Sequence, residues 1–229
     1  MLVLFDIDGT LLIKGATEHA QALLEAIEEV WGIAVGQQLA VQAAGRTDTE
    51  IAREILLLGG VDARAIDERL GDFREAAVRR YVELVPGDLS PRLAPHAATV
   101  VEALAADEAF RLSLVTGNIE PIARLKLLRA GIGRHFQHGQ GGFGSDSEDR
   151  SDLPPVARTR AASWNGGQPW PRERTVVVGD TPRDIACARA DGVHVVAVTT
   201  GPYVAEALTG ADAVIAGLDE LPSALAALR

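Results

Sequence analysis

Short, mostly apolar runs recur along the chain and predict buried strands. They span residues 2–5, 112–115, 175–178, 193–198 and 213–215. Apolar runs of this length without alternation are typical of strands covered on both faces of a sheet. Residues 96–106, 121–130, 182–190 and 221–228 carry apolar positions at helical spacing instead. Because strands and helices alternate, the pattern predicts an α/β fold with a parallel sheet between two layers of helices.

The alternation breaks once, in the long interval between the first two apolar runs. Residues 17–31, 49–58 and 67–85 have helical spacing, and nothing in this interval has the pattern of a strand. We therefore expect an all-helical domain at residues 14–88, inserted into an α/β domain formed by residues 1–13 and 89–229. Residues 139–155 and 163–172 are rich in Gly, Pro, Ser and Asp, which predicts loops.

Composition and charge narrow the classes of partner. The chain has 229 residues and a net charge of -10, from 22 basic and 32 acidic side chains. This balance argues against general binding to nucleic acid or to an anionic membrane, which requires a basic face. Apolar runs of membrane-spanning length and a signal sequence are both lacking, so we expect a cytoplasmic protein. The single cysteine, Cys187, rules out an internal disulfide and is expected to be a small core residue.

Two aspartates directly follow the first predicted strand. Asp6 and Asp8 lie two positions apart, before Gly9 and Thr10. Residues two apart on an extended chain point the same way, and the carboxyl end of a parallel strand is where open α/β sheets bind ligands. Two carboxylates this close favour a divalent cation such as Mg²⁺ between them. An acidic turn with no ligand is the alternative.

Polar residues also follow two other predicted strands. Thr116, Gly117 and Asn118 follow residues 112–115, where a hydroxyl and the N–H groups of a helix N-terminus suit a phosphate. Helix capping by Asn118 is the alternative. Asp180 and Asp184 follow residues 175–178, and Thr181 and Asp184 also have the spacing of a capping box. Asp6, Asp8, Asp180 and Asp184 would then meet at one edge of the sheet, and this much negative charge implies a metal ion.

Two other patterns are weaker. Residues 139–144 match the glycine spacing of a dinucleotide-binding turn, but no helix pattern follows and no acidic residue lies about twenty positions further on. A flexible loop is the better interpretation. The five histidines, including His19, lack the spacing of metal ligands, so we expect surface or capping roles for them.

The three polar motifs, in this order, resemble those of the haloacid dehalogenase (HAD) superfamily, with its phosphoglycolate phosphatase-like branch nearest. The resemblance covers the whole chain and implies a Rossmann-like core with a helical cap inserted after the first motif. It implies that Asp6 attacks phosphorus and that Asp8 acts as acid and then base. It further implies that Asp6, the backbone carbonyl of Asp8, Asp180 and Asp184 hold Mg²⁺. Thr116 and the N–H groups after it, with Gly9, Thr10, Gly117 and Asn118, would surround the phosphate.

The third motif of the family, a lysine upstream of the fourth, has no direct counterpart. Lys14 and Lys126 do not lie at the corresponding place in the sequence. Arg150 is the candidate for this role and Arg158 the alternative, with a permanent charge in place of a compact ammonium. In the cap, the resemblance places the loop of Arg46 over the pocket, where Arg46 would meet a carboxylate or phosphate of the substrate. Thr47 or Asp48 would cap the following helix.

The family contains several activities. An aspartate at position 8 favours phosphoryl transfer over dehalogenation, so we expect a Mg²⁺-dependent phosphatase for a small phosphorylated metabolite, such as phosphoglycolate or a sugar phosphate. A phosphomutase of the β-phosphoglucomutase type is the alternative, although His19 is one position away from the mutase histidine. A non-catalytic phospho-acceptor module is the third hypothesis, against which the strand-end motif and the helical insert argue.

Overall fold

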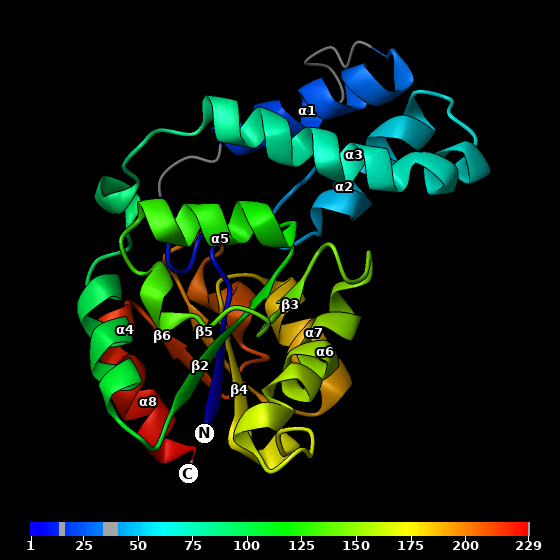
Figure 1. Cartoon of the computed structure of the whole chain (residues 1–229). Helices are drawn as coiled ribbons and strands as arrows, with labels where there is room; N and C mark the ends of the chain where they lie inside the picture. The colour runs from blue at the N-terminus through cyan, green and yellow to red at the C-terminus, as the bar shows by residue number, and fades with distance from the viewer. Residues whose placement is uncertain (14–16, 34–40, 229) are drawn as a thin grey trace.

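The computed structural model describes residues 1–13, 17–33 and 41–228, and a parallel six-stranded sheet forms its centre (Figure 1). The strands are β1 (Leu2–Phe5), β2 (Arg111–Thr116), β3 (Gly142–Phe143), β4 (Thr175–Gly179), β5 (His194–Val198) and β6 (Ala213–Ile215). Their order across the sheet is β3-β2-β1-β4-β5-β6. Because β1 pairs with β2 on one side and β4 on the other, the ends of these three strands share one edge.

Helices cover both faces of the sheet, and side chains of β1 alternate between them. Val3 and Phe5 join one apolar cluster with α4 (Ala97–Ala106), α5 (Glu120–Arg129) and α8 (Leu221–Ala227). Leu2 and Leu4 join a second cluster with α6 (Leu153–Arg160) and α7 (Pro182–Asp191). The predicted α/β fold is therefore confirmed.

Three helices lie between β1 and β2 in the sequence and pack on one another. They are α1 (Thr17–Trp31), α2 (Asp48–Leu58) and α3 (Ala63–Leu84). They lie beyond the carboxyl ends of the strands, with α3 running alongside α5 (Figure 1). Their position is where a helical cap was expected, and the division at residues 14 and 88 stays a prediction. Lys14 lies outside the described residues.

The sequence prediction is wrong in one stretch. Residues 139–155 contain the short strand β3 and the start of α6, where a flexible loop was expected. Gly142 and Phe143 pair with Val115 and Thr116 and are fully covered. Two residues are too few to show a strand pattern, so this edge of the sheet depends on tertiary contacts.

Short 3-10 helices fill several connections; they span Ser90–Arg92, Gly133–His135, Arg150–Asp152, Ala161–Trp164, Arg172–Arg174, Ala205–Leu208 and Leu218–Glu220. Within the described part of the chain, no helix combines the length and the apolar character that crossing a membrane requires.

Candidate active site

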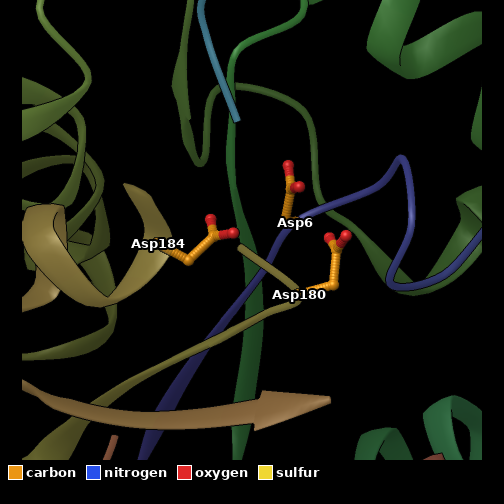
Figure 2. A group of neighbouring side chains, drawn as sticks. All are labelled: Asp6, Asp180 and Asp184. Carbon is orange, nitrogen blue, oxygen red and sulfur yellow. The ribbon is translucent and has the colours of Figure 1, made fainter. Parts of the chain in front are cut away.

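Three buried aspartates meet at the carboxyl edge of the sheet. Asp6 follows β1, Asp180 follows β4, and Asp184 lies in the first turn of α7 (Figure 2). Each offers a carboxylate oxygen, and these atoms lie within 4.8 Å of one another. Three hard oxygen donors at this separation have the chemistry of a Mg²⁺ site. The structure therefore brings together three of the four aspartates that the sequence assigned to a metal.

The ionisation of these carboxylates is strongly perturbed. Burial, together with the charges of Asp184 and Asp8, raises the pKa of Asp6 to about 6 against the opposing charge of Arg150. Burial and the charges of Asp6 and Asp184 raise the pKa of Asp180 to about 8. Since like charges at short range disfavour ionisation, a bound cation would lower both values.

Arg150 is the cation next to the aspartate cluster. Its Nη2 donates to Asp184 Oδ1 at 2.5 Å and lies 3.2 Å from Asp6 Oδ1. The guanidinium is 5% exposed, and its Nε has no hydrogen-bond partner among the described residues. Arg158 instead pairs with Asp191 at 2.6 Å, at the other end of α7. Of the two arginines considered for the third motif, only Arg150 lies in this site.

The backbone around the cluster is tightly constrained. Asp184 also completes the predicted capping box, because its carboxylate accepts from the Thr181 N–H at 3.0 Å. Gly9 has a φ of +90°, and a Cβ there would lie 2.2 Å from Asp180 Oδ2. The Thr10 hydroxyl donates to Asp180 Oδ1 at 3.1 Å. Gly9 and Thr10 therefore position Asp180.

Asp8 does not belong to the three-carboxylate group and makes a separate set of contacts. Asn118 Nδ2 donates to Asp8 Oδ2 at 2.8 Å and to Thr116 Oγ1 at 3.0 Å. The alternative interpretation of Asn118 as a helix cap does not apply, because the N-cap of α5 is Ile119 and the Asn118 side chain contacts Asp8. Thr116, Gly117 and Asn118 thus lie beside Asp8, at the end of the strand next to β1.

Lys126 of α5 is a site residue that the sequence analysis missed. Its Nζ donates to both carboxylate oxygens of Asp8, at 2.6 and 2.8 Å, and to Asn118 Oδ1 at 2.6 Å. Burial would raise the pKa of Asp8, but the charges of Lys126 and His19 and the hydrogen bonds from Lys126 and Asn118 hold it below its ordinary value. Asp6 and Asp8, two residues apart, therefore have opposite shifts.

His19 of α1 extends this network to the helical insert. Its Nδ1 lies 3.1 Å from Lys126 Nζ and its Nε2 lies 3.1 Å from Asp48 Oδ2. Asp48 Oδ2 also accepts from the Ile119 N–H at 2.8 Å. The expected surface or capping role of His19 is wrong, because the side chain is buried at 7% exposure.

The segment before α2 is docked closely on the core. Asp48 N–H donates to Gly117 O at 2.8 Å, and the Thr49 hydroxyl donates to Gly144 O at 3.0 Å. Thr47 is the N-cap of α2, as expected, and its hydroxyl also donates to Glu148 O at 2.9 Å. A Cβ at Gly117 would lie 2.0 Å from Arg46 O, so the close approach requires glycine.

A cavity of about 650 Å³ lies between the aspartates and the three helices of the insert. Asp6, Asp8, Asn118, Lys126 and Arg150 line its floor. Arg46 lines it too, but its guanidinium contacts Glu54 and lies 3.3 Å from Glu50. The loop position expected for Arg46 agrees with the structure, while its charge is already paired.

Comparisons with known proteins agree with this geometry. Residues 3–189 match the haloacid dehalogenase-like hydrolase family. Comparison with curated protein sequences gives no match. Among solved structures, β-phosphoglucomutase (pgmB) from Clostridium difficile superposes with a TM-score of 0.72 at 17% identity, covering 99% of this chain and 97% of that one. A predicted phosphoglycolate phosphatase from Haemophilus somnus 129pt gives a TM-score of 0.65 at 20% identity, covering 97% and 96%. At these identities the structures share the fold.

Proposed function

Because this chain belongs to the haloacid dehalogenase-like hydrolase family, we propose that it is a Mg²⁺-dependent phosphatase acting on a small phosphorylated metabolite. The observation that carries the proposal is the contrast between two carboxylates on one strand end. Asp6 faces the cluster of acidic side chains, and Asp8 faces Lys126. Pairs of carboxylates in different environments are typical of active sites in which one carboxylate is the nucleophile and the other is the acid and base.

The donor set fits a hard divalent cation. Asp6, Asp180 and Asp184 would hold it, with the backbone carbonyl of Asp8 as a further oxygen ligand. The raised pKa values of Asp6 and Asp180 support this assignment, because burial and neighbouring carboxylates disfavour their ionised forms, which a bound cation would stabilise. When bound, Mg²⁺ supplies positive charge that lets an anionic nucleophile approach an anionic phosphate.

In this proposal Asp6 is the nucleophile and Asp8 the acid and base. A carboxylate oxygen of Asp6 forms a bond to phosphorus while the ester oxygen leaves with a proton from Asp8. Water then attacks the aspartyl-phosphate and gives a proton to Asp8, which releases inorganic phosphate and restores Asp6. Lys126 stabilises ionised Asp8, the form that the second step requires.

Three further groups would bind the phosphoryl oxygens. Thr116 Oγ1 accepts from Asn118, so its own proton remains to donate. The backbone N–H groups of Gly117 and Asn118 precede the N-terminus of α5, a position that favours anions. Arg150 adds a fixed positive charge beside Asp6. In the proposed domain division, residues 14–88 form the cap and residues 1–13 and 89–229 the core.

The direct test is Asp6→Asn with p-nitrophenyl phosphate and Mg²⁺, measured by phosphate release. We expect loss of turnover by a factor of about 10⁴ or more, as for removal of other covalent nucleophiles. The matched control is Asp219→Asn, an exposed aspartate outside the cavity, which should hydrolyse at the wild-type rate. Turnover retained by Asp6→Asn would refute the assignment of the nucleophile.

A phosphomutase is the second candidate, and the position of His19 favours it. His19 contacts Lys126, which holds Asp8, so a cap residue is linked to the acid–base carboxylate. Phosphorus NMR of the enzyme with glucose 1-phosphate distinguishes the two activities. Conversion to another sugar phosphate without free phosphate would indicate a mutase, whereas free phosphate would indicate a phosphatase.

A further inference from the structure

The cavity has a polar floor and an apolar wall. The floor holds the carboxylates of Asp6 and Asp8, with Lys126 and Arg150. On the side of the helical insert, the aliphatic lining comes from α1, α2 and the segment after β1; it consists of Leu12, Ile13, Leu23, Leu24, Ile51 and Ile55. The polar side chains that line the same side are those of Glu18, His19, Arg46, Asp48 and Tyr81. Ile13, Leu24 and Ile51 are only partly buried, so part of their apolar surface remains available to a ligand.

Charged side chains on the same wall are already paired. Glu18 accepts from Arg92 at 2.7 and 2.8 Å. His19 lies between Asp48 and Lys126, as described above.

Every lysine and arginine that lines the cavity within the described residues contacts a carboxylate; these residues are Arg46, Arg92, Lys126 and Arg150. A second anionic group on the substrate would have to break one of these ion pairs, at a cost in desolvation and in lost attraction.

The hydroxyl groups of a sugar would also meet a poor surface here. Each hydroxyl loses its hydrogen bonds to water when it is buried, and aliphatic carbon does not replace them. An alkyl or aryl group, by contrast, gains free energy from leaving water against the same side chains. The volume of about 650 Å³ lies within the range of small-molecule sites.

We propose that the organic part of the substrate is an uncharged apolar group, so that the site takes alkyl or aryl phosphomonoesters in preference to sugar phosphates or phosphoglycolate. This inference rests on the proposed phosphatase function and identifies its substrate class. The phosphate would lie on the polar floor, and the apolar group would lie against Leu24 and Ile51.

The first test is a substrate series of ethyl, butyl and hexyl phosphate, with glucose 6-phosphate and phosphoglycolate beside it. We expect kcat/KM to rise about fourfold for each methylene group that enters the cavity, which gives about 250-fold for the four methylene groups that separate ethyl from hexyl phosphate. Equal kcat/KM along the series, or a preference for phosphoglycolate or glucose 6-phosphate, would overturn the inference while leaving the phosphatase function intact.

A pair of variants locates the preference in the cavity. Leu24→Asn places an amide on the apolar wall and should lower the hexyl-to-ethyl ratio of kcat/KM by about tenfold. Leu58→Asn makes the same change on α2 at a side chain that is 61% exposed and outside the cavity. This control should keep the wild-type ratio. Equal ratios in both variants would place the preference elsewhere and contradict the proposal.

A binding experiment separates this inference from the proposed function. Calorimetric titration of Asp6→Asn, in Mg²⁺, with ethyl and hexyl phosphate requires no turnover. Tighter binding of hexyl phosphate by about 250-fold supports the apolar site, and equal affinities refute it. If the wild-type enzyme hydrolyses none of the esters, p-nitrophenyl phosphate included, the phosphatase function fails and the titration still decides the ligand class.

Discussion

The contact between Asp8 and Lys126 allows a quantitative prediction about stability. Lys126 Nζ lies 2.6 and 2.8 Å from the two oxygens of Asp8, and its side chain is only 3% exposed. A double-mutant cycle of Asp8→Asn, Lys126→Met and the combined variant isolates the energy of this pair. Methionine keeps the length of the lysine stem without its charge, so packing changes little.

The magnitude follows from the distances and the exposure. At an effective dielectric constant near 20, two unit charges about 2.7 Å apart attract by about 6 kcal/mol before desolvation is counted. Because the Asp8 side chain is 36% exposed, solvent screens part of this attraction. We expect a coupling energy of about 2–3 kcal/mol, well above that of a surface pair.

Urea denaturation followed by circular dichroism, in EDTA at pH 7, measures the coupling without a contribution from metal. The control cycle uses Arg64 and Glu68 of α3, a pair at 2.9 Å whose side chains are 86% and 61% exposed. That pair should give about 0.3–0.5 kcal/mol. A coupling below about 0.5 kcal/mol for Asp8 and Lys126 would refute the reasoning.

The pH dependence has a defined sign. The pKa of Asp8 is held below its ordinary value, because burial, the largest single effect, is outweighed by the charges of Lys126 and His19 together with the hydrogen bonds from Lys126 and Asn118. The stabilisation is therefore complete above about pH 3.9, the value of an aspartate in an unfolded chain, and it is lost as the pH falls through the lower folded value. The coupling should thus persist at pH 5.

Three further predictions concern the aspartate cluster and the arginines near it. Gly201→Ala would place a Cβ 1.7 Å from Asp180 Oδ2 and should weaken Mg²⁺ binding at least tenfold by calorimetry, whereas Gly71→Ala, with open space around it, should not. Arg150→Ala should lower the rate of phosphate release at least 100-fold. Arg158→Ala breaks a buried pair with Asp191 and should lower the free energy of unfolding by about 3 kcal/mol. Below the melting temperature of this variant, its rate of phosphate release should equal that of the wild type. The pKa values of about 6 for Asp6 and about 8 for Asp180 lie above those of the unfolded chain, so their contribution to the stability of the metal-free protein is lost as the pH rises from 4 through 8. Stabilisation by Mg²⁺ in thermal melts should therefore be larger at pH 8 than at pH 5, and the reverse order would contradict the metal assignment.

Much of the fold could be predicted because buried parallel strands have a simple signature. The apolar runs at residues 2–5 and 175–178 became β1 and the first four residues of β4, since both faces of these strands are covered by helices. The edge of the sheet had no such signature. β3 is two residues long, and Gly142 is held by a register with Val115 that only the folded chain provides.

The aspartate cluster could be predicted from the parallel arrangement of the strands alone. Residues that end neighbouring parallel strands meet at one edge, and this rule places Asp6 beside Asp180. The position of Lys126 in the site could not be predicted in this way, because a lysine within a helix usually lies in solvent. One signal was available: Lys126 is four residues after Ile122 and beside Leu127, on the face of α5 that is buried. A charged residue within a buried stripe indicates a partner there.

The sequence around Arg46 indicates that its guanidinium pairs with nearby glutamates. Glu50 and Glu54 follow at intervals of four residues, the spacing at which side chains meet on one helix face. Both carboxylates contact the Arg46 guanidinium in the structure. The resemblance predicted that the Arg46 charge binds the substrate, but this charge is paired with glutamates of the insert. The pairing agrees with a substrate whose organic part is apolar rather than anionic.

The glycine-rich stretch at residues 139–144 has a packing role that its resemblance to a nucleotide-binding turn conceals. A Cβ at Gly144 would lie 1.9 Å from Gly117 O, and the Gly144 carbonyl accepts from the Thr49 hydroxyl. The Gly117 carbonyl, which this Cβ would meet, accepts a hydrogen bond from the Asp48 N–H. Two glycines thus let three backbone segments meet, and this contact brings Asp48 within reach of His19 and hence of the Lys126–Asp8 pair. The absence of side chains at Gly117 and Gly144 therefore allows the helical insert to pack closely beside Asp8 and Lys126.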